Sequence, residues 1–511
     1  MVRWAGMRVL RLVVALTWVW LAGLTVAALI GFDVRRHNFE AAGLAFGVAL
    51  SILMLVAMSA DEAPCARPRV PRLTIVAVVV VALVAFGWSL SLGPLSDDFA
   101  LVQWARTRDF VPAEWPYMRP LPLALWAGIT SAGGDWATLH AVNVLGHACN
   151  ASLVAVLGSA WLGTRAALTA GLVYALFPAS AEAVAWAAGV FDVLATTCAL
   201  SAVLVGVHRP PSPSSAVAVA ALTFAGLLCK ESAIAIPALI LVSNVVMTRR
   251  WSARGLVTLG SSAAVCVGYL FLRLAASSSV TDHLSNWPTG RRAWKDVLVR
   301  PFAGVAVPIR TDGGVPLSAY VAVASLLLLL SLAAVASSRR NRAASPIGAG
   351  YLGGVAWIIA AAAPLLLSFY VAPNLEGSRY LYLPAVGYAL VVAAAASASC
   401  HPTSRAVGHA CVAILLVTFA VSGNIERQHW RAGAALRDSL LAEAQRAAAE
   451  DACSEMEIVD APDNLRGVFV FRVGVQQAIR PLLTPRTPPR TCRLRWTGER
   501  LAALPASVDP K

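Results

Sequence analysis

The chain has 511 residues, of which 58% are hydrophobic and only 13% are charged. A soluble globular domain carries about 25% charged residues, so this composition excludes a soluble protein. The net charge is +14, but the arginines collect in short loops between apolar runs. That distribution orients membrane proteins and argues against a nucleic-acid-binding surface.

Apolar runs recur along the chain, and each is long enough to cross ~30 Å of hydrocarbon as a helix. We predict an all-α polytopic membrane protein with about 13 transmembrane helices. The first run is too long for a signal peptide, so we expect the segment to be retained. The predicted spans lie near 9–31, 41–59, 73–93, 139–158, 166–181, 189–207, 215–229, 232–247, 255–276, 317–337, 347–369, 380–398 and 406–423.

The loop arginines predict the orientation of the chain. A cytoplasmic N-terminus places most of them on the inner side, as the positive-inside bias requires. This places the loop 94–138 and the tail 424–511 on the outer face. We therefore predict a protein of the bacterial inner membrane, with a transmembrane domain at 1–423 and a soluble extracytoplasmic domain at 424–511.

An acidic pair, Asp97-Asp98, follows the third apolar run. It begins a stretch, 99–136, that is amphipathic and too polar to cross a bilayer. Paired carboxylates at the mouth of a helix bundle indicate a site of chemistry.

The next predicted span carries a polar stripe of His140, Asn143, His147 and Asn150. At about 100° per residue these side chains share one helix face within an arc of roughly 80°. Facing lipid would cost several kcal/mol, so the stripe meets protein or water. Interhelical hydrogen bonding and the lining of a substrate cavity both fit. His140 and His147 have no third metal ligand in the sequence.

The following outer hairpin carries Glu182 and Asp192. Glu182 shares a side and a depth with Asp97, which makes it a catalytic candidate beside a purely structural reading. Asp192 either caps the start of the next helix or lines the cavity.

Two basic residues mark candidate phosphate sites. Lys230 either forms a local ion pair with Glu231 or binds a phosphate, with Glu231 beside the cavity. Arg379 stands at the outer start of the twelfth span, where it either snorkels to headgroups or grips a lipid phosphate with its planar fork. Tyr382 fits an interfacial aromatic belt or the cavity wall.

The tail 424–511 reads as a small α/β appendage. Residues 430–450 have helical spacing, 457–459 and 467–473 read as strands, and the proline-rich stretch from Pro481 is expected to be extended. Cys453 and Cys492 form a disulfide if the tail faces an oxidising compartment, or remain free thiols.

Together these motifs resemble the type-C glycosyltransferase (GT-C) superfamily. Within it the chain is similar to bacterial relatives of the transmembrane O-mannosyltransferases with tetratricopeptide repeats. The matching motifs, in the order of that family, are Asp97-Asp98, His140-x-x-Asn143-x-x-x-His147, Pro178-x-x-x-Glu182 with Asp192, Lys230-Glu231, and Arg379-x-x-Tyr382-Leu383-Pro384.

The resemblance implies a GT-C-like enzyme that moves a sugar from a polyprenyl phosphate to an extracytoplasmic acceptor with inversion. An acidic residue of the first outer loop would be the general base. Neighbouring side chains point in different directions, so Asp97 and Asp98 would not share one proton; one would react while the other orients a partner or metal, and we take Asp97 as the base. The leaving phosphate needs Arg379 and Lys230, or a divalent metal such as Mg or Mn.

The sequence departs from this family in two places. The repeat array is absent, and Val190 stands where the family often has arginine. Two alternatives therefore stay open: a transporter or flippase of lipid-linked saccharides, and a scaffold with a degenerate transferase core. A transporter would place its charges near the midplane, whereas here they lie at the outer ends of the spans. Protein, lipid and polysaccharide acceptors all fit the sequence.

Overall fold

The computed structural model describes most of the chain from residue 70 onward, and the predicted spans at 9–31, 41–59 and 317–337 lie outside the described part. The described residues are 70–113, 115, 117–208, 212–248, 253–276, 302–312, 346–364, 371–397, 402–450, 453–483 and 490–503.

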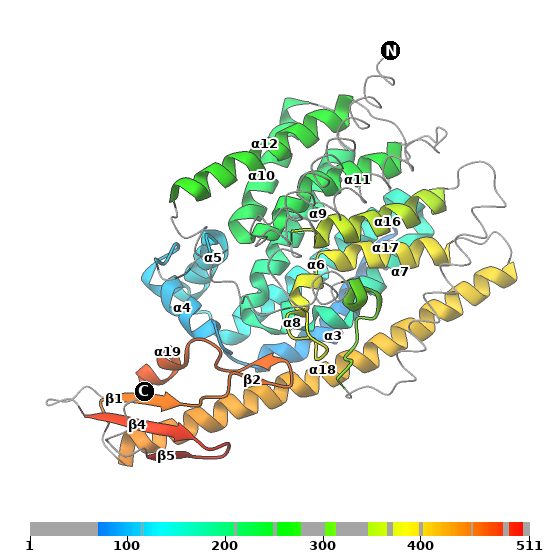
Figure 1. The fold of residues 1–511 in the computed structure, drawn as a ribbon. Coiled ribbons are helices and arrows are strands. Elements are labelled where there is room, and N and C mark those ends of the chain that lie inside the picture. Colours follow the sequence, from blue (N-terminus) through cyan, green and yellow to red (C-terminus); the bar gives the residue numbers. More distant parts are fainter. Residues whose placement is uncertain are drawn as a thin grey trace, which may run out of the picture.

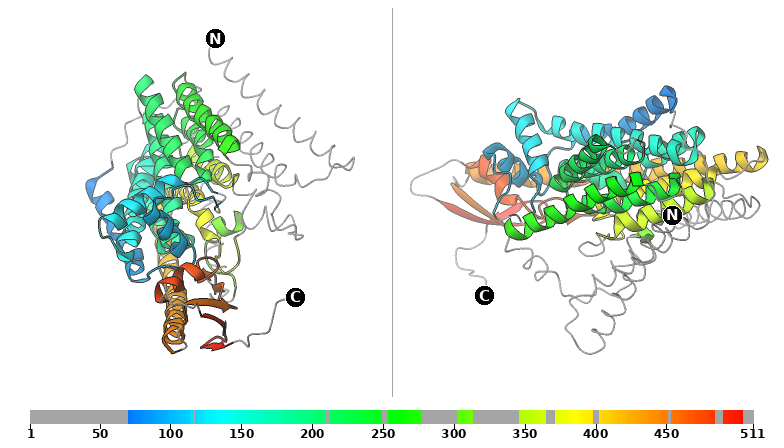
Figure 2. Two further views of the ribbon diagram at one scale, coloured as in Figure 1. Left: turned by 90° about the vertical axis from the view of Figure 1, so that its left-hand side faces the viewer. Right: turned by 90° about the horizontal axis from the view of Figure 1, so that it is seen from above.

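A bundle of apolar helices forms the main body (Figure 1). The helix α6 lies inside it and packs against α3, α7 and α9, while α16 and α17 pack on each other. The two further views show the helices side by side in one body, with the strands at one end (Figure 2). The bundle helices are α3 (Arg72–Phe86), α6 (Trp136–Leu162), α7 (Thr164–Ala175), α9 (Val190–His208), α10 (Pro213–Cys229), α11 (Ile236–Thr248), α12 (Ala253–Ala276), α16 (Pro346–Ala362) and α17 (Pro384–Ala396).

Each predicted span within the described residues overlaps a helix, and the chain is an integral membrane protein. Four of the described helices are long and apolar enough to cross a membrane, or five if a bent pair counts as one span. Five further apolar helices are shorter, at 10–17 residues. The predicted number of 13 spans therefore stays a prediction.

The predicted span 166–181 is not one continuous helix but a bent pair. The helix α7 ends at Ala175, and η2 (Pro178–Ser180) with α8 (Ala181–Ala185) continues at an angle of 54°. Pro178 breaks the helix because its ring nitrogen cannot donate a hydrogen bond. The turn η3 (Ala187–Gly189) then folds back on α8 so closely that a Cβ at Gly189 would lie 2.0 Å from the Ala183 carbonyl oxygen.

Several of the loops between the bundle helices carry short helices. The loop 94–138 holds α4 (Asp98–Thr107) and α5 (Pro120–Ser131) after η1 (Gly87–Ser91), in agreement with its amphipathic sequence. Two more turns, η4 (Glu231–Ala235) and η5 (Ser378–Leu381), lead into α11 and α17. These turns bring polar residues to the same end of the bundle.

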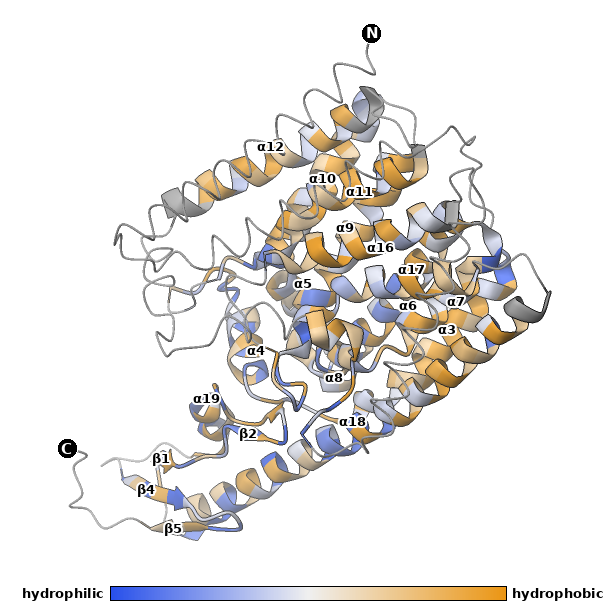
Figure 3. Cartoon of the chain, turned by 45° about the vertical axis from the view of Figure 1, so that its right-hand side comes forward, coloured by the Kyte–Doolittle hydropathy of each residue, from blue (hydrophilic) through white to orange (hydrophobic). Residues whose placement is uncertain are grey.

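One helix, α18 (Pro402–Glu450), runs without interruption from the bundle to the C-terminal strands (Figure 1). The predicted span 406–423 and the predicted helix 430–450 are therefore parts of one element. Hydropathy changes along it, with hydrophilic residues along the part beside the strands (Figure 3).

The C-terminal region forms two small sheets. In the first, β1 (Glu455–Val459) pairs parallel with β4 (Thr491–Trp496), which pairs antiparallel with β5 (Leu501–Ala503). In the second, β2 (Asn464–Leu465) pairs antiparallel with β3 (Val468–Phe469). The helix α19 (Val475–Ile479) and the turn η6 (Arg480–Leu482) follow.

Of the two strands predicted for this region, one is confirmed and the other is paired only in part. The predicted strand 457–459 lies in β1, as expected. The predicted strand 467–473 is paired only at Val468 and Phe469. Gly467 and Gly474 bound that segment with φ of +89° and +88°, a left-handed conformation that ends a strand.

A disulfide joins Cys453 to Cys492, which lie 39 residues apart. Closing a loop of this length stabilises a fold by about 2–4 kcal/mol. We expect the double variant Cys453→Ser/Cys492→Ser to lose that stability in the C-terminal region, measured as faster limited proteolysis of residues after 450. Cys149→Ser, which removes a free thiol, is the control. Equal proteolysis of the double variant and the wild type would contradict the expectation.

Candidate functional site

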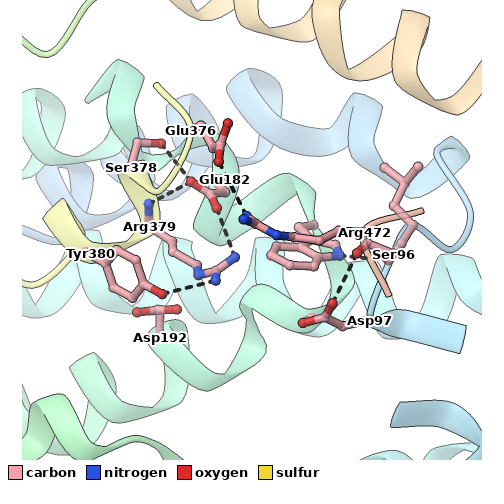
Figure 4. A network of polar contacts seen from close by, with 12 residues as sticks. Ser96, Asp97, Glu182, Asp192, Glu376, Ser378, Arg379, Tyr380 and Arg472 are labelled. Carbon is pink, nitrogen blue, oxygen red and sulfur yellow. Dashed lines mark hydrogen bonds and ion pairs between the residues drawn. The ribbon is translucent and has the colours of Figure 1, made fainter. Parts of the chain in front are cut away.

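Arg379 occupies the centre of a polar network built from the turns at one end of the bundle (Figure 4). Its guanidinium donates to Glu182 Oε1 at 2.9 Å, and its backbone amide donates to Oε2 of the same carboxylate at 3.2 Å. Ser378 also donates to Glu182, at 3.4 Å. The Glu182 side chain is nearly fully buried, whereas one fifth of Arg379 remains exposed. Glu182 therefore holds Arg379 in place, and Arg379 presents the accessible charge.

Aromatic rings surround this guanidinium. Its carbon lies 4.7 Å from the centre of the Trp186 ring and 5.0 Å from that of Tyr380. Burial alone would lower the pKa of Arg379, but Tyr380, Glu182 and Asp192 raise it overall. Arg379 is therefore permanently charged and oriented.

Lys230 forms the second ion pair of the site. Its Nζ lies 2.5 Å from Asp192 Oδ1, with both side chains buried, and 4.6 Å from the centre of the Tyr380 ring. Tyr380 thus contacts both cations, because its hydroxyl also accepts from Arg379 Nη2 at 3.1 Å. Asp192 stands in the first turn of α9 without being its N-cap, and its carboxylate is the partner of Lys230.

The third pair joins Arg119, just before α5, to Glu231 in η4, with Arg119 Nη2 at 2.6 Å from Glu231 Oε2. The guanidinium of Arg119 also stacks on Tyr117, 4.1 Å from the ring centre. The local ion pair considered for Lys230 and Glu231 is replaced by these two pairings across elements. Three cations, each held by a carboxylate, thus share one end of the bundle.

The members of the acidic pair have different surroundings. Asp98 is fully buried, and its two oxygens accept the backbone amides of Leu95 and Ala188, both at 2.8 Å. Burial raises the pKa of the Asp98 carboxyl well above its ordinary value, although the two amides lower it. Asp98 therefore clamps the loop to η3 and is closed to a substrate.

Asp97 is partly exposed at the N-terminus of α4 and accepts a hydrogen bond from Ser96 Oγ at 3.1 Å. Its charge acts on both Arg379 and Tyr117. Figure 4 shows its carboxylate in the same network as Arg379 and Asp192. Of the two aspartates, Asp97 is the one that a bound hydroxyl could reach.

The polar stripe on α6 is fully buried. Asn143 donates to the Trp186 carbonyl at 2.6 Å, and Asn150 donates to the Val193 carbonyl at 3.0 Å. His140 Nε2 lies 3.1 Å from the Gly93 carbonyl, and His147 Nδ1 lies 2.8 Å from the Tyr382 hydroxyl. These contacts are the interhelical hydrogen bonds that the sequence left open beside a cavity-lining role.

Tyr382 belongs to this interior network. It is almost fully buried and receives a second hydrogen bond from Asn150 at 3.2 Å. The aromatic-belt interpretation is therefore wrong for Tyr382, because a belt residue meets lipid headgroups.

Within the described ranges, no three His, Cys, Asp or Glu side chains gather as ligands for a metal ion. Both oxygens of Asp98 accept backbone amides, and Glu182, Asp192 and Glu231 are each paired with a cationic side chain. These residues do not fit a divalent metal, so no step below is routed through one.

Sequence reasoning missed Arg119 and the C-terminal contribution of Phe469, whose ring centre lies 5.8 Å from the Arg379 guanidinium. Arg119 had a weak signal, because it stands between Tyr117 and Pro120 in the amphipathic loop. Phe469 had none, since its neighbour is 90 positions away in sequence.

The sequence matches no protein-family model and no curated protein. The fold is similar to that of ArnT from Cupriavidus metallidurans in the apo state, with a TM-score of 0.50 and 18% identity over 83% of this chain and 93% of that one. ArnT bound to undecaprenyl phosphate gives 0.48 and 17% over 80% and 85%. An Archaeoglobus fulgidus oligosaccharyltransferase tethered with an acceptor peptide gives 0.41 and 13% over 73% and 57%.

The match to apo ArnT extends over nearly the whole length of the ArnT chain, so the likeness concerns the overall architecture rather than one segment. The closer similarity to repeat-bearing O-mannosyltransferases stays a prediction. The protein shares the polytopic helical fold of this ArnT structure.

Proposed function

We propose that the protein is a membrane glycosyltransferase that moves a sugar from a polyprenyl phosphate to an extracytoplasmic acceptor. The observation that carries the proposal is the cation cluster of Arg379, Lys230 and Arg119 beside the partly exposed Asp97. A planar arginine fork and a lysine point charge are the groups that bind a phosphate. A carboxylate beside them supplies a general base.

In the proposed reaction, Asp97 accepts the proton of the acceptor hydroxyl. The hydroxyl oxygen attacks the anomeric carbon from the face opposite the phosphate, so a new glycosidic bond forms with inversion. The bond between the anomeric carbon and the phosphate oxygen breaks, and that oxygen keeps the electron pair. Arg379 and Lys230 stabilise the negative charge on the polyprenyl phosphate as it leaves.

The remaining residues have positioning roles in this mechanism. Glu182 orients Arg379, Asp192 orients Lys230, and Asp98 holds the loop that presents Asp97. Tyr380 accepts a hydrogen bond from Arg379 and so helps to orient its guanidinium. A transporter would place its charges along a path at midplane depth, whereas the site groups lie in turns at the ends of the helices.

Mass spectrometry of envelope glycans and glycoproteins in a deletion strain tests the proposal. We expect one glycan species to disappear and to return when the wild-type chain is supplied, but not when Asp97→Asn is supplied. Full restoration by Asp97→Asn would overturn the catalytic assignment and favour the scaffold alternative.

The charge state of Lys230 predicts a pH dependence of donor binding. Burial lowers the pKa of its ammonium to about 8, although Asp192 opposes the shift. The protonated form of Lys230 binds the phosphate. The affinity for the phosphate is therefore at its maximum well below pH 8, and it falls as the pH rises through that value, by up to about tenfold per pH unit. We therefore expect the dissociation constant of undecaprenyl phosphate, measured on the purified chain, to rise between pH 7 and pH 10.

Lys230→Arg is the control for this titration. Because arginine keeps its charge over the whole range, the decline above pH 8 should vanish in this variant. The same pH profile in the variant and the wild type would show that Lys230 is not the titrating group.

A further inference from the structure

The C-terminal segment 464–474, here named the bridging segment, contacts the loop that carries Asp97. The backbone amide of Ser96 donates to the Val470 carbonyl at 2.8 Å, and the amide of Val473 donates to Ser96 Oγ at 3.4 Å. At Gly474, a Cβ would lie 2.7 Å from the Ser96 carbonyl oxygen. Ser96, the residue just before Asp97, thus contacts the C-terminal region through its amide, its hydroxyl and its carbonyl.

The same segment contacts the loop that carries Arg379. Asn464 donates to Glu376 Oε2 at 3.0 Å, and Arg472 donates to Glu376 Oε1 at 3.4 Å. The Phe469 ring packs between two guanidinium groups, 4.5 Å from that of Arg472 and 5.8 Å from that of Arg379. Figure 4 shows Arg472 reaching from the Ser96 side of the network toward Glu376. The bridging segment therefore contacts both the loop that carries Asp97 (residues 92–98, here named the base loop) and the loop that carries Arg379.

Two buried arginines fix this arrangement. Arg437, on α18, donates from Nη1 to the carbonyls of Leu92 and Pro94 at 2.6 and 2.7 Å. Arg310 pairs with Glu426 of α18 at 2.6 Å and donates to the Arg466 carbonyl at 2.5 Å. Arg437 holds the base loop, and Arg310 holds the start of the bridging segment.

The base loop needs such support, because its backbone is strained. Ser96 has a φ of 47°, in the left-handed region that side-chain-bearing residues avoid. A residue persists in this conformation only when its surroundings over-determine it. Three contacts hold the backbone in this conformation: the hydrogen bond of the Ser96 amide to Val470, the hydrogen bonds from Arg437, and the contact of Asp98 with η3.

We propose that Arg437 is a positioning residue for Asp97, and that with the bridging segment it sets the base at a fixed place relative to Arg379. The C-terminal region then completes the active site, although it supplies no reacting group. This inference rests on the proposed function for its consequence in transfer, whereas the clamp itself is testable without it.

The first test compares Arg437→Met, Arg437→Lys and the wild type as purified full-length chains. Amide hydrogen exchange of residues 92–98 should accelerate in Arg437→Met by about tenfold or more, because the loop opens locally. The glycan product in the complemented deletion strain should fall by about 10²-fold, the usual cost of a misplaced catalytic group. Arg437→Lys, which keeps the charge and one donor, should restore part of both readouts.

The dissociation constant of undecaprenyl phosphate separates positioning from general damage. It should stay within about twofold of wild type in Arg437→Met, because Arg379 and Lys230 keep their partners. The control is Arg446→Met on the exposed face of the same helix, which should change none of the three readouts.

A second variant covers the case in which Arg437→Met does not fold. Gly474→Ala presses a methyl group against Ser96. Gly498→Ala also places alanine at a positive φ, but its methyl group would have no atom within 4 Å. Gly474→Ala should loosen residues 92–98 and reduce the product, and Gly498→Ala should do neither. Unchanged exchange in Arg437→Met and Gly474→Ala, or a loss of undecaprenyl phosphate affinity as large as the loss of product, would overturn the proposal. A wild-type chain that forms no glycan would contradict the proposed function, and the exchange data would still decide the clamp.

Discussion

Asp97→Asn is expected to reduce glycan transfer by about 10²–10⁴-fold, the contribution of a positioned general base. The substitution preserves the shape of the side chain and the hydrogen bond from Ser96, so the fold and the phosphate site should be unaffected. The measurement is the amount of glycan product in the deletion strain, normalised to the amount of chain in the membrane.

Asp98→Asn is the matched control, because it makes the same chemical change one residue away. An asparagine there can accept only one of the amides of Leu95 and Ala188, and its own amide group meets the other. We expect a loss of about 1–3 kcal/mol of stability in this buried contact. A stable Asp98→Asn that loses transfer completely, beside an active Asp97→Asn, would reverse the assignment of the base.

Arg379→Met is expected to abolish binding of the donor phosphate and with it the transfer. Losing a bidentate phosphate ligand is compounded by the buried Glu182 carboxylate, which is left without its partner. Breaking a buried pair in this way costs about 3–5 kcal/mol. The dissociation constant of undecaprenyl phosphate reports the first effect, and thermal unfolding of the purified chain reports the second.

Arg379→Met/Glu182→Met separates the two effects. Removing both partners relieves the unpaired charge, so stability should recover while phosphate binding stays lost. Arg480→Met, at an exposed arginine of the C-terminal region, should leave both readouts at wild-type values. Recovery of phosphate binding in the double variant would show that Arg379 serves only to pair with Glu182.

The helical bundle was predictable because a long apolar segment that crosses a membrane folds as a helix. In hydrocarbon every backbone amide must be satisfied internally, so a long apolar segment becomes a helix. Hence 139–158 coincides with α6, and the polar stripe of His140, Asn143, His147 and Asn150 is buried on one face. The bend at Pro178 was underestimated, because the apolar residues continue beyond the proline.

Most members of the polar cluster could be selected from the sequence, but their pairings could not. Most of the predicted acids and bases have a partner that lies far along the chain, such as Asp192 for Lys230 or Arg119 for Glu231. A pairing of this kind depends on the crossing of helices, which local patterns do not report. The adjacency of Lys230 and Glu231 was therefore a poor guide to their partners.

The C-terminal contribution was the least predictable part. The sequence indicates a soluble α/β tail, and nothing in it shows that residues 464–474 reach both the Asp97 loop and the Arg379 loop. Gly467 and Gly474 were the usable signal, because glycines at both ends of a short apolar strand indicate tight turns against another surface.

In the proposed function, the cation cluster of Arg379, Lys230 and Arg119 receives a lipid phosphate. Native mass spectrometry of the full-length chain with equal amounts of undecaprenyl phosphate and undecaprenol tests it most directly. The account predicts that the phosphate lipid binds, that the alcohol does not compete, and that Arg379→Met abolishes the preference. Equal binding of the two lipids by the wild-type chain would contradict it.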